Sequence, residues 1–224
     1  MTVRNNRIRN FQGSLIAFDF DGTLTTADYR SSWQAVHEYF GTWATHGKTA
    51  LRRFIDGEIN YTEFCIADAY PWINQSESEY QRALATIKLR DGISELLTFF
   101  KENKCILVII SQGLKDLVEK VAHKYNFNFW VANELIRKKN RITGDVEVNV
   151  DVLDKGKILQ SLLGSYKIPQ KKSIAIGDAS ADIDMFKTAN ISIAIEPSSK
   201  KVADCADFVC QSEDLSEIIT FFDI

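Results

Sequence analysis

The chain has 224 residues, of which 45% are hydrophobic, 25% charged and 11% aromatic; this composition is typical of a folded globular protein and excludes a disordered or collagen-like chain. The formal net charge of −3 leaves no basic excess for non-specific binding to a nucleic-acid backbone, and no apolar run approaches the roughly 20 residues of a membrane-spanning helix. Four scattered cysteines do not make a disulfide framework. We therefore expect a cytoplasmic protein with one large domain, or with a domain that carries an insert.

Short apolar runs alternate with helical patterns along most of the chain. Leu15 to Phe18 is short, apolar and continuous, as expected of a buried strand, and Ile106 to Ile110 is a second run of this kind. Further strands are predicted at 173–176, 191–195 and 208–210, and helices at 92–103, 114–125, 155–165, 180–189 and 215–222. This alternation predicts an α/β fold in which helices cover both faces of a mostly parallel sheet.

Two regions break the alternation. Residues 26–88 contain no good strand run, and their patterns predict helices instead, beginning with one that Ser31 or Ser32 can cap and Gly41 can end. Further helices are predicted there at 48–55, 61–70 and 77–87. We therefore expect an all-helical insert at 26–88 within a core made of 1–25 and 89–224. Later in the chain, a Lys-Lys-Asn-Arg turn within 137–150 predicts a β-hairpin.

Polar motifs follow the predicted strands, and ligands bind at the carboxyl ends of the strands in open α/β sheets. The motif DFDGTLT, residues 19–25, follows the first strand. Alternation along a strand predicts that Asp19 and Asp21 project to the same side, where two carboxylates repel each other unless they share a cation or a proton. The alternative is an ordinary polar turn, because Asp-Gly-Thr is common in turns.

Three later motifs lie at similar junctions. Ser111-Gln112-Gly113 offers a hydroxyl and backbone N–H groups to an anion, or forms a plain helix cap. Lys155 opens a helix and opposes the helix dipole, which a bound anion would explain; the alternative is solvated surface. Asp178 ends a strand, and Asp182 lies one turn into the next helix, where an acid also serves as a cap.

As a set, these motifs resemble those of the haloacid dehalogenase superfamily of phosphatases. The resemblance is carried by DFDGTLT at 19–25, SQG at 111–113, DKGK at 154–157 and GDASADIDMF at 177–186. It covers nearly the whole chain from Leu15, and the segment VANELIRKKNRITGDVE is similar to the phosphoserine-phosphatase branch. The resemblance implies a Rossmann-like core, a helical cap domain at 26–88, and hydrolysis of a small-molecule phosphate monoester.

The resemblance also implies a catalytic scheme. Asp19 is expected to attack phosphorus and form a phosphoaspartate, which divides a difficult hydrolysis into two easier steps. Asp21 is expected to act as general acid and then as general base. Mg²⁺ is the expected cofactor, bound by the carboxylates of Asp19 and Asp178 and by the backbone carbonyl of Asp21, because it prefers oxygen ligands.

The remaining motif residues are expected to surround the phosphoryl group. Lys155 supplies positive charge and orients the nucleophile. Asp182 supports the metal site without binding the metal, because Ala181 stands where the family commonly has a polar Asn. Contacts to the phosphoryl oxygens are expected from Ser111, Gln112, Gly113 and Thr23.

The cap departs from the phosphoserine-phosphatase pattern. The arginine that grips the substrate carboxylate in that branch falls on Asp68, and the glutamate that holds the ammonium falls on Asp28. Arg52 or Arg53 could replace the missing arginine, or both could be solvated surface. Two acids favour a substrate whose far end is cationic or hydroxylated over phosphoserine.

Two other functions stay open at this point. A phosphotransferase or phosphomutase would use the same intermediate, and a non-catalytic binding protein could have kept the fold. A dehalogenase is disfavoured, because it needs neither Mg²⁺ nor a second aspartate acting as an acid. We expect neither a nucleic-acid nor a membrane partner, and either a monomer or a homodimer.

Overall fold

The computed structural model describes residues 7–29 and 31–223, and within these residues one seven-stranded sheet forms the centre of the molecule. Its strand order is β4-β3-β2-β1-β5-β6-β7, and every neighbouring pair is parallel except β3 with β4. The α/β fold with a mostly parallel sheet is therefore confirmed. The strands are β1 (Leu15–Phe18), β2 (Ile106–Leu114), β3 (Phe129–Lys138), β4 (Arg141–Glu147), β5 (Ser173–Gly177), β6 (Ile191–Ile195) and β7 (Phe208–Cys210).

The short strand β1 lies in the middle of the sheet. It pairs with β2 on one side and with β5 on the other, and all four of its residues are fully buried. Burial on both faces explains why its sequence is continuously apolar and does not alternate. The parallel pairing brings the carboxyl ends of β1, β2 and β5 to the same edge of the sheet, where the polar motifs follow.

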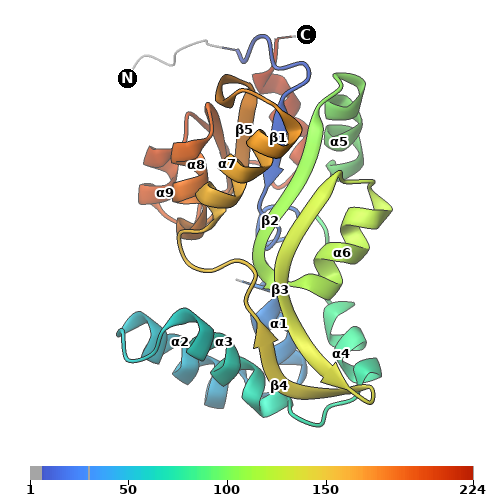
Figure 1. The fold of residues 1–224 in the computed structure, drawn as a ribbon, viewed down its shortest axis with the longest axis vertical. Helices are drawn as coiled ribbons and strands as arrows, with labels where there is room; N and C mark the ends of the chain where they lie inside the picture. Colours follow the sequence, from blue (N-terminus) through green and yellow to red (C-terminus); the bar gives the residue numbers. More distant parts are fainter. Residues whose placement is uncertain (1–6, 30, 224) are drawn as a thin grey trace.

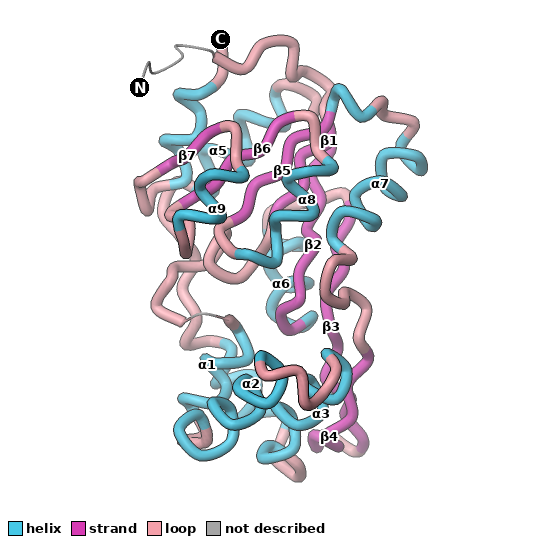
Figure 2. Tube along the Cα trace, turned by 90° about the vertical axis from the view of Figure 1, so that its left-hand side faces the viewer, coloured by secondary structure: helices cyan, strands magenta, loops and turns pink. Residues whose placement is uncertain are grey.

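Helices cover both faces of the sheet (Figures 1 and 2). On one face, Ile16 and Phe18 share a hydrophobic core with α5 (Ile93–Glu102) and α6 (Lys115–Lys124). On the other face, Leu15 and Ala17 pack with α7 (Lys155–Tyr166), α8 (Ile183–Thr188) and α9 (Lys200–Cys205). Successive β1 side chains thus enter opposite cores, as expected when a strand is buried on both faces.

The insert is helical, and it lies beyond the carboxyl edge of the sheet, at the lower end of Figure 1. In its described part, 26–29 and 31–88, no residue belongs to a strand. Ser31 caps the first helix by accepting a hydrogen bond from the Gln34 backbone, which confirms the predicted start. The insert contains α1 (Ser32–Tyr39), a π-helical turn (Trp43–Gly47), α2 (Lys48–Ile55), α3 (Tyr61–Ala69), a 3-10 turn (Tyr70–Trp72) and α4 (Glu77–Leu84).

The hairpin of β3 and β4 reaches down to the helical insert. The backbone N–H of Asn74 donates to Ile142 at 3.0 Å, Ile142 donates to Gln75 at 3.1 Å, and Glu77 donates to Asn140 at 3.0 Å. The hairpin tip is therefore bonded to the insert, although the sequence places it with the core. The division into a core and a cap at 26–88 stays a prediction, and we use the word cap for the helical insert.

Several elements differ from the sequence prediction. Strand β2 continues through 111–113 to Leu114, with an irregular register against β3, so these residues do not lie between a strand and a helix. Strand β3 begins at Phe129, before the predicted hairpin. The sequence pattern missed this first part of the strand because Asn133, which is polar but fully buried, interrupts the apolar run. The segment 215–221 is a 3-10 helix, Ser180–Asp182 forms a 3-10 turn before α8, and α9 was not predicted.

Two further findings concern membranes and cysteines. Among the described residues, no helix combines the length and the apolar character needed to cross a bilayer. All four cysteines are free thiols, and three of them are buried. The absence of a disulfide framework agrees with the prediction from the cysteine spacing.

Candidate active site

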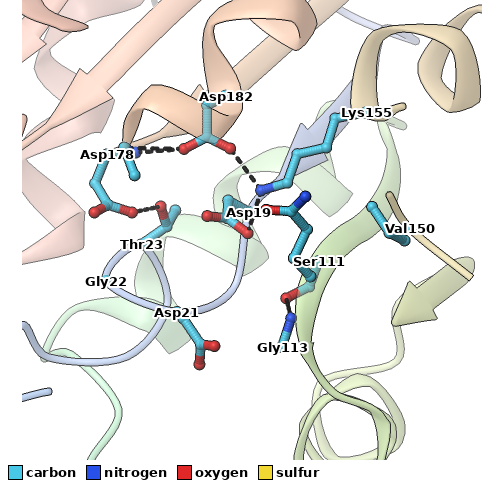
Figure 3. A network of polar contacts seen from close by, with 12 residues as sticks. Asp19, Asp21, Gly22, Thr23, Ser111, Gly113, Val150, Lys155, Asp178 and Asp182 are labelled. Carbon is cyan, nitrogen blue, oxygen red and sulfur yellow. Dashed lines mark hydrogen bonds and ion pairs between the residues drawn. The ribbon is translucent and has the colours of Figure 1, made fainter. Parts of the chain in front are cut away.

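The loop after β1 carries the two acids of the first motif (Figure 3). Because β1 ends at Phe18, these acids lie in a loop, and strand alternation does not determine where they point. Asp19 Oδ1 lies 2.7 Å from Lys155 Nζ, whereas Asp21 Oδ2 accepts hydrogen bonds from the Ser32 N–H and hydroxyl, each at 2.8 Å. Both acids line one cavity, as the same-side expectation requires, but a loop rather than strand alternation places them there, and they contact different partners.

Lys155 is buried between two carboxylates. Its Nζ lies 2.7 Å from Asp19 Oδ1 and 2.7 Å from Asp182 Oδ1, and its side chain is 2% exposed. Burial alone would lower the pKa of Lys155, but the two negative charges offset this and hold the pKa above its ordinary value. Lys155 is therefore an ammonium at neutral pH, and the alternative of a solvated surface lysine is wrong.

Asp182 is fully buried and uses both of its carboxylate oxygens on neighbouring groups. Oδ1 accepts from Lys155, and Oδ2 accepts from the N–H groups of Asp178 and Ala179, each at 3.0 Å. A Cβ on Gly177 would lie 2.5 Å from this carboxyl group, so glycine is required for the close approach. Asp182 thus fixes the lysine and the turn after β5 at the same time.

Three carboxylates gather around the single ammonium. Oxygen atoms of Asp19, Asp178 and Asp182 all lie within 4.8 Å of one another. Burial, and then the charge of Asp182, raise the pKa of Asp19 well above its ordinary value and that of Asp178 to about 7. A divalent cation would relieve this excess of negative charge, and oxygen donors suit a hard cation. Asp19 and Asp178 can face it, because both oxygens of Asp182 are occupied.

Asp178 is positioned by the loop after β1. Thr23 Oγ1 donates to Asp178 Oδ1 at 2.8 Å, and Thr23 is fully buried outside the cavity lining. The Thr23 hydroxyl, expected at the phosphoryl group, thus orients an acid instead. Gly22 has a φ of +78°, and a Cβ there would lie 2.5 Å from Asp178 Oδ2. Only glycine allows both this backbone conformation and this contact.

Arg90 supports the same loop, and the sequence analysis missed it. Its side chain is 1% exposed, and Nε and Nη2 donate to the Gly22 carbonyl at 3.2 and 2.8 Å. Nη1 donates to Glu196 at 2.5 Å, which pairs the buried charge. No signal in the sequence around Arg90 distinguishes it from a surface arginine, because its partners are 68 and 106 positions away.

The opposite side of the cavity contains the second motif. Ser111 is buried, and its Oγ accepts a hydrogen bond from the Gly113 N–H at 2.9 Å. Because α6 has Leu114 at its N-cap, without a side-chain hydrogen bond, the alternative of a plain helix cap is wrong. A Cβ on Gly113 would lie 2.5 Å from Asp21 Oδ2, so the strand passes close to the acid.

Ser32, the first residue of α1, connects the insert to this site. Its hydroxyl donates to Asp21 Oδ2 and accepts from the Leu114 N–H at 2.9 Å, so it bridges the β1 loop and β2. Within the described residues, Asp21 Oδ1 is buried without a hydrogen-bond partner. Burial raises the pKa of Asp21, and the two bonds from Ser32 oppose that shift.

A cavity of about 360 Å³ lies between the sheet edge and the helical insert. At the core end it is lined by polar groups, among them Asp19, Asp21, Lys155 and the segment 111–113. At the cap end its lining is mostly aromatic and aliphatic and includes Trp33, Trp43, Leu51, Phe54, Ile55, Tyr61 and Phe64. The two ends of the cavity therefore present different chemistry to one molecule.

The predicted cap residues occupy different places. Asp68 lines the cavity and is buried, with Oδ1 2.8 Å from His37 Nε2. Asp28 is exposed and accepts from Thr26 at 3.0 Å, outside the cavity lining, so the structure does not bring it to Asp68. Arg52 and Arg53 are also exposed, and each faces an acid of the insert at 3.4 Å.

Known proteins resemble the chain in sequence and structure. The family model for haloacid dehalogenase-like hydrolases matches residues 55–221. The phosphoserine phosphatase of Methanocaldococcus jannaschii is 28% identical over 214 residues, which cover 92% of this chain and 96% of that protein. The phosphoserine phosphatase of Idiomarina loihiensis is 27% identical over 206 residues, with coverages of 92% and 91%.

Solved structures agree with this result. A structure described as a phospho-aspartyl intermediate analogue of phosphoserine phosphatase has a TM-score of 0.83 at 25% identity and covers 95% of this chain and 100% of that one. A substrate-bound phosphoserine phosphatase complex has a TM-score of 0.82 at 25% identity, with coverages of 94% and 99%. The chain therefore belongs to the haloacid dehalogenase-like hydrolases, and it is a phosphatase similar to their phosphoserine-phosphatase branch.

Proposed function

We propose that this phosphatase hydrolyses the monoester of a small phosphorylated metabolite, with Mg²⁺ as cofactor and a phosphoaspartate on Asp19 as intermediate. One observation carries the proposal: the carboxyl ends of β1 and β2 bring a lysine-paired acid, a second acid and the Ser111 hydroxyl into one cavity. The names of the similar proteins support a phosphate ester as the substrate. The free cysteines support a reducing cytoplasm.

Asp19 is the proposed nucleophile. Lys155 binds Oδ1, which opposes the rise in the pKa of Asp19 that burial causes and leaves the other oxygen to face the phosphoryl group. When bound, Mg²⁺ supplies positive charge between the carboxylates and the phosphoryl oxygens. Ser111 accepts from the Gly113 N–H, so its own proton is free to bind a phosphoryl oxygen.

Asp21 is the proposed acid and base. Ser32 holds Oδ2 with two hydrogen bonds, which leaves the unpartnered Oδ1 to transfer a proton. In the first step the Asp19–phosphorus bond forms, the ester bond breaks, and Asp21 gives its proton to the leaving oxygen. In the second step Asp21 takes a proton from water, the water oxygen bonds to phosphorus, and inorganic phosphate leaves Asp19.

Hydrolysis of p-nitrophenyl phosphate by the purified protein tests this proposal. We expect Mg²⁺-dependent release of p-nitrophenol and inorganic phosphate in equal amounts. A metabolite alcohol added as acceptor separates hydrolysis from transfer, because a phosphotransferase or phosphomutase would release less phosphate than p-nitrophenol. No turnover with Mg²⁺ would favour a non-catalytic binding protein.

A further inference from the structure

We infer that the preferred substrate is the phosphate ester of a cationic alcohol, such as an amino alcohol without a carboxylate. The inference rests on the proposed function and names its substrate class. It follows from the cap end of the cavity, where aromatic rings and one buried carboxylate lie together. Among the described residues, the only cationic side chain that lines this cavity is Lys155, which is already bound to two acids.

The aromatic rings are held in fixed positions. The Trp33 Nε1 donates to the Gln112 carbonyl at 3.1 Å, which ties this ring to strand β2. Phe54 stacks on Phe64 with centroids 5.1 Å apart and contacts Tyr61 edge-on at 5.7 Å. The face of an aromatic ring carries negative potential and attracts an organic cation, whereas it gives no stabilisation to a carboxylate.

Asp68 adds a negative charge in the same wall. It is 2% exposed, and its Oδ1 lies 2.8 Å from Nε2 of the fully buried His37. The other nitrogen of His37 lies 2.7 Å from Thr42 Oγ1, so the ring is held between two polar groups. Burial raises the pKa of Asp68, and the His37 contact opposes that shift and favours the carboxylate. Asp68 Oδ1 makes the contact to His37, and Asp68 lines the cavity.

The aromatic rings and the Asp68 carboxylate together disfavour a substrate carboxylate at the cap end. Such a group would lose its hydration among aromatic rings without gaining a cation from the described lining, and Asp68 would repel it. Arg52 lines an adjoining hollow that shares Trp43, Leu51 and Ile55 with the cavity, but it lies outside the cavity lining and faces Asp56 at 3.4 Å. Arg53 is exposed outside the cavity lining and faces Glu58 at 3.4 Å. A substrate ammonium group, in contrast, gains both the ring faces and the acid.

Three phosphate esters of similar size separate the contributions. Phosphoethanolamine and L-phosphoserine differ only by the carboxylate, and n-propyl phosphate replaces the ammonium with a methyl group. We expect kcat/KM for phosphoethanolamine to exceed the other two values by about tenfold or more, as for a charged hydrogen bond gained or lost. Equal values for L-phosphoserine, or a lead for it, would overturn the inference. Equal values for n-propyl phosphate would also overturn it and indicate an apolar far end.

Variants test whether the cap end causes this preference. Asp68→Asn keeps a similar shape but removes the charge, and we expect it to reduce the ratio of phosphoethanolamine to n-propyl phosphate by about tenfold. Glu38→Gln removes an exposed acid of the insert outside the cavity lining and should leave the ratio unchanged. If Asp68→Asn does not fold, Phe64→Leu removes one ring and should lower the same ratio. An unchanged ratio in both cavity variants contradicts the inference.

Two further measurements separate this inference from the proposed function. Calorimetric binding to Asp19→Asn compares phosphoethanolamine with L-phosphoserine without turnover. If the wild-type protein hydrolyses none of the esters, tighter binding of phosphoethanolamine would refute the reaction but keep the recognition. A preference for L-phosphoserine that disappears in Arg30→Ala would show that a residue outside the described part binds the carboxylate, and it would overturn the inference.

Discussion

The two ends of the cavity differ in what holds their side chains. At the core end, charged groups hold one another: Lys155 contacts Asp19 and Asp182, and Asp182 binds the backbone of Asp178. At the cap end, aromatic rings pack around one buried pair of His37 and Asp68. Such packing tolerates a change of shape more readily than a charge network tolerates the loss of one charge.

We infer from this difference that the two ends of the cavity have different roles. The core end carries out a reaction that depends on the phosphoryl group, which every phosphate monoester shares. The cap end contacts the part of the substrate in which one ester differs from another. Substitutions at the core end should therefore reduce turnover of all esters alike, whereas substitutions at the cap end should change their ranking.

The largest expected effect is that of Asp19→Asn. An amide oxygen is a poor nucleophile, so we expect a loss of more than about a hundredfold in kcat, or about 2.7 kcal/mol, for every ester tested. Steady-state kinetics with p-nitrophenyl phosphate measures the loss. Asp204→Asn is a matched control, because Asp204 is an exposed acid that pairs with Lys200. A residual rate above a hundredth of wild type would contradict covalent catalysis by Asp19.

Removal of divalent cations should abolish hydrolysis, because the metal site lies at the core end of the cavity. We expect EDTA to inactivate the enzyme and Mg²⁺ to restore it, because the carboxylates of Asp19 and Asp178 need a hard cation. Ca²⁺ should not restore activity, since its larger and more flexible coordination can take both oxygens of Asp19 and misalign the attack. Full activity after exhaustive chelation would rule out this metal site.

Lys155→Met should destabilise the core end itself. Without the ammonium, the acids Asp19 and Asp182 are buried together with no partner charge, so we expect the free energy of unfolding to fall by roughly 3–5 kcal/mol in EDTA. Urea denaturation measures the change. Lys157→Met provides the control, because Lys157 is largely exposed in the same helical turn. Equal stability of the two variants would show that the lysine is not needed to balance these charges.

The sequence predicted the core end better than the cap end, for a physical reason. Asp19, Ser111 and Asp178 lie at or near the ends of strands β1, β2 and β5, and parallel pairing alone brings such positions together. Their side-chain partners were not predictable in the same way. The direction of Asp21, toward Ser32, depends on where β1 ends and α1 begins.

At the cap end, contacts depend on how helices pack. His37 and Asp68 are 31 positions apart on different helices, and no local pattern links them. The motif comparison could assign Asp68 to the substrate site but could not show its histidine partner. It also grouped Asp28 with Asp68, although the structure places Asp28 at the surface. The helical character of the insert was nevertheless correctly predicted for its described part, because amphipathic periodicity is a local property.

Ser32→Ala tests the link between the two ends. It removes one of the two hydrogen bonds to Asp21 Oδ2, and we expect kcat to fall by about tenfold to a hundredfold for alkyl phosphates. The loss should be smaller for p-nitrophenyl phosphate, whose leaving group needs little protonation. Ser31→Ala is the control: it removes the N-cap of α1 and should lower stability by about 1 kcal/mol without any dependence on the leaving group. The same loss for both classes of ester would contradict a role through Asp21.

The smallest expected effect is that of Arg90→Lys, which keeps the buried charge opposite Glu196 but cannot make both hydrogen bonds to the Gly22 carbonyl. The loop after β1 should then hold Asp178 less firmly, because Gly22 packs directly against that carboxylate. We expect the Mg²⁺ concentration for half-maximal activity to rise by about fivefold, as for the loss of one ordinary hydrogen bond, with kcat at saturating Mg²⁺ nearly unchanged. A purely structural role would instead lower the midpoint of urea denaturation and leave the Mg²⁺ dependence unaltered.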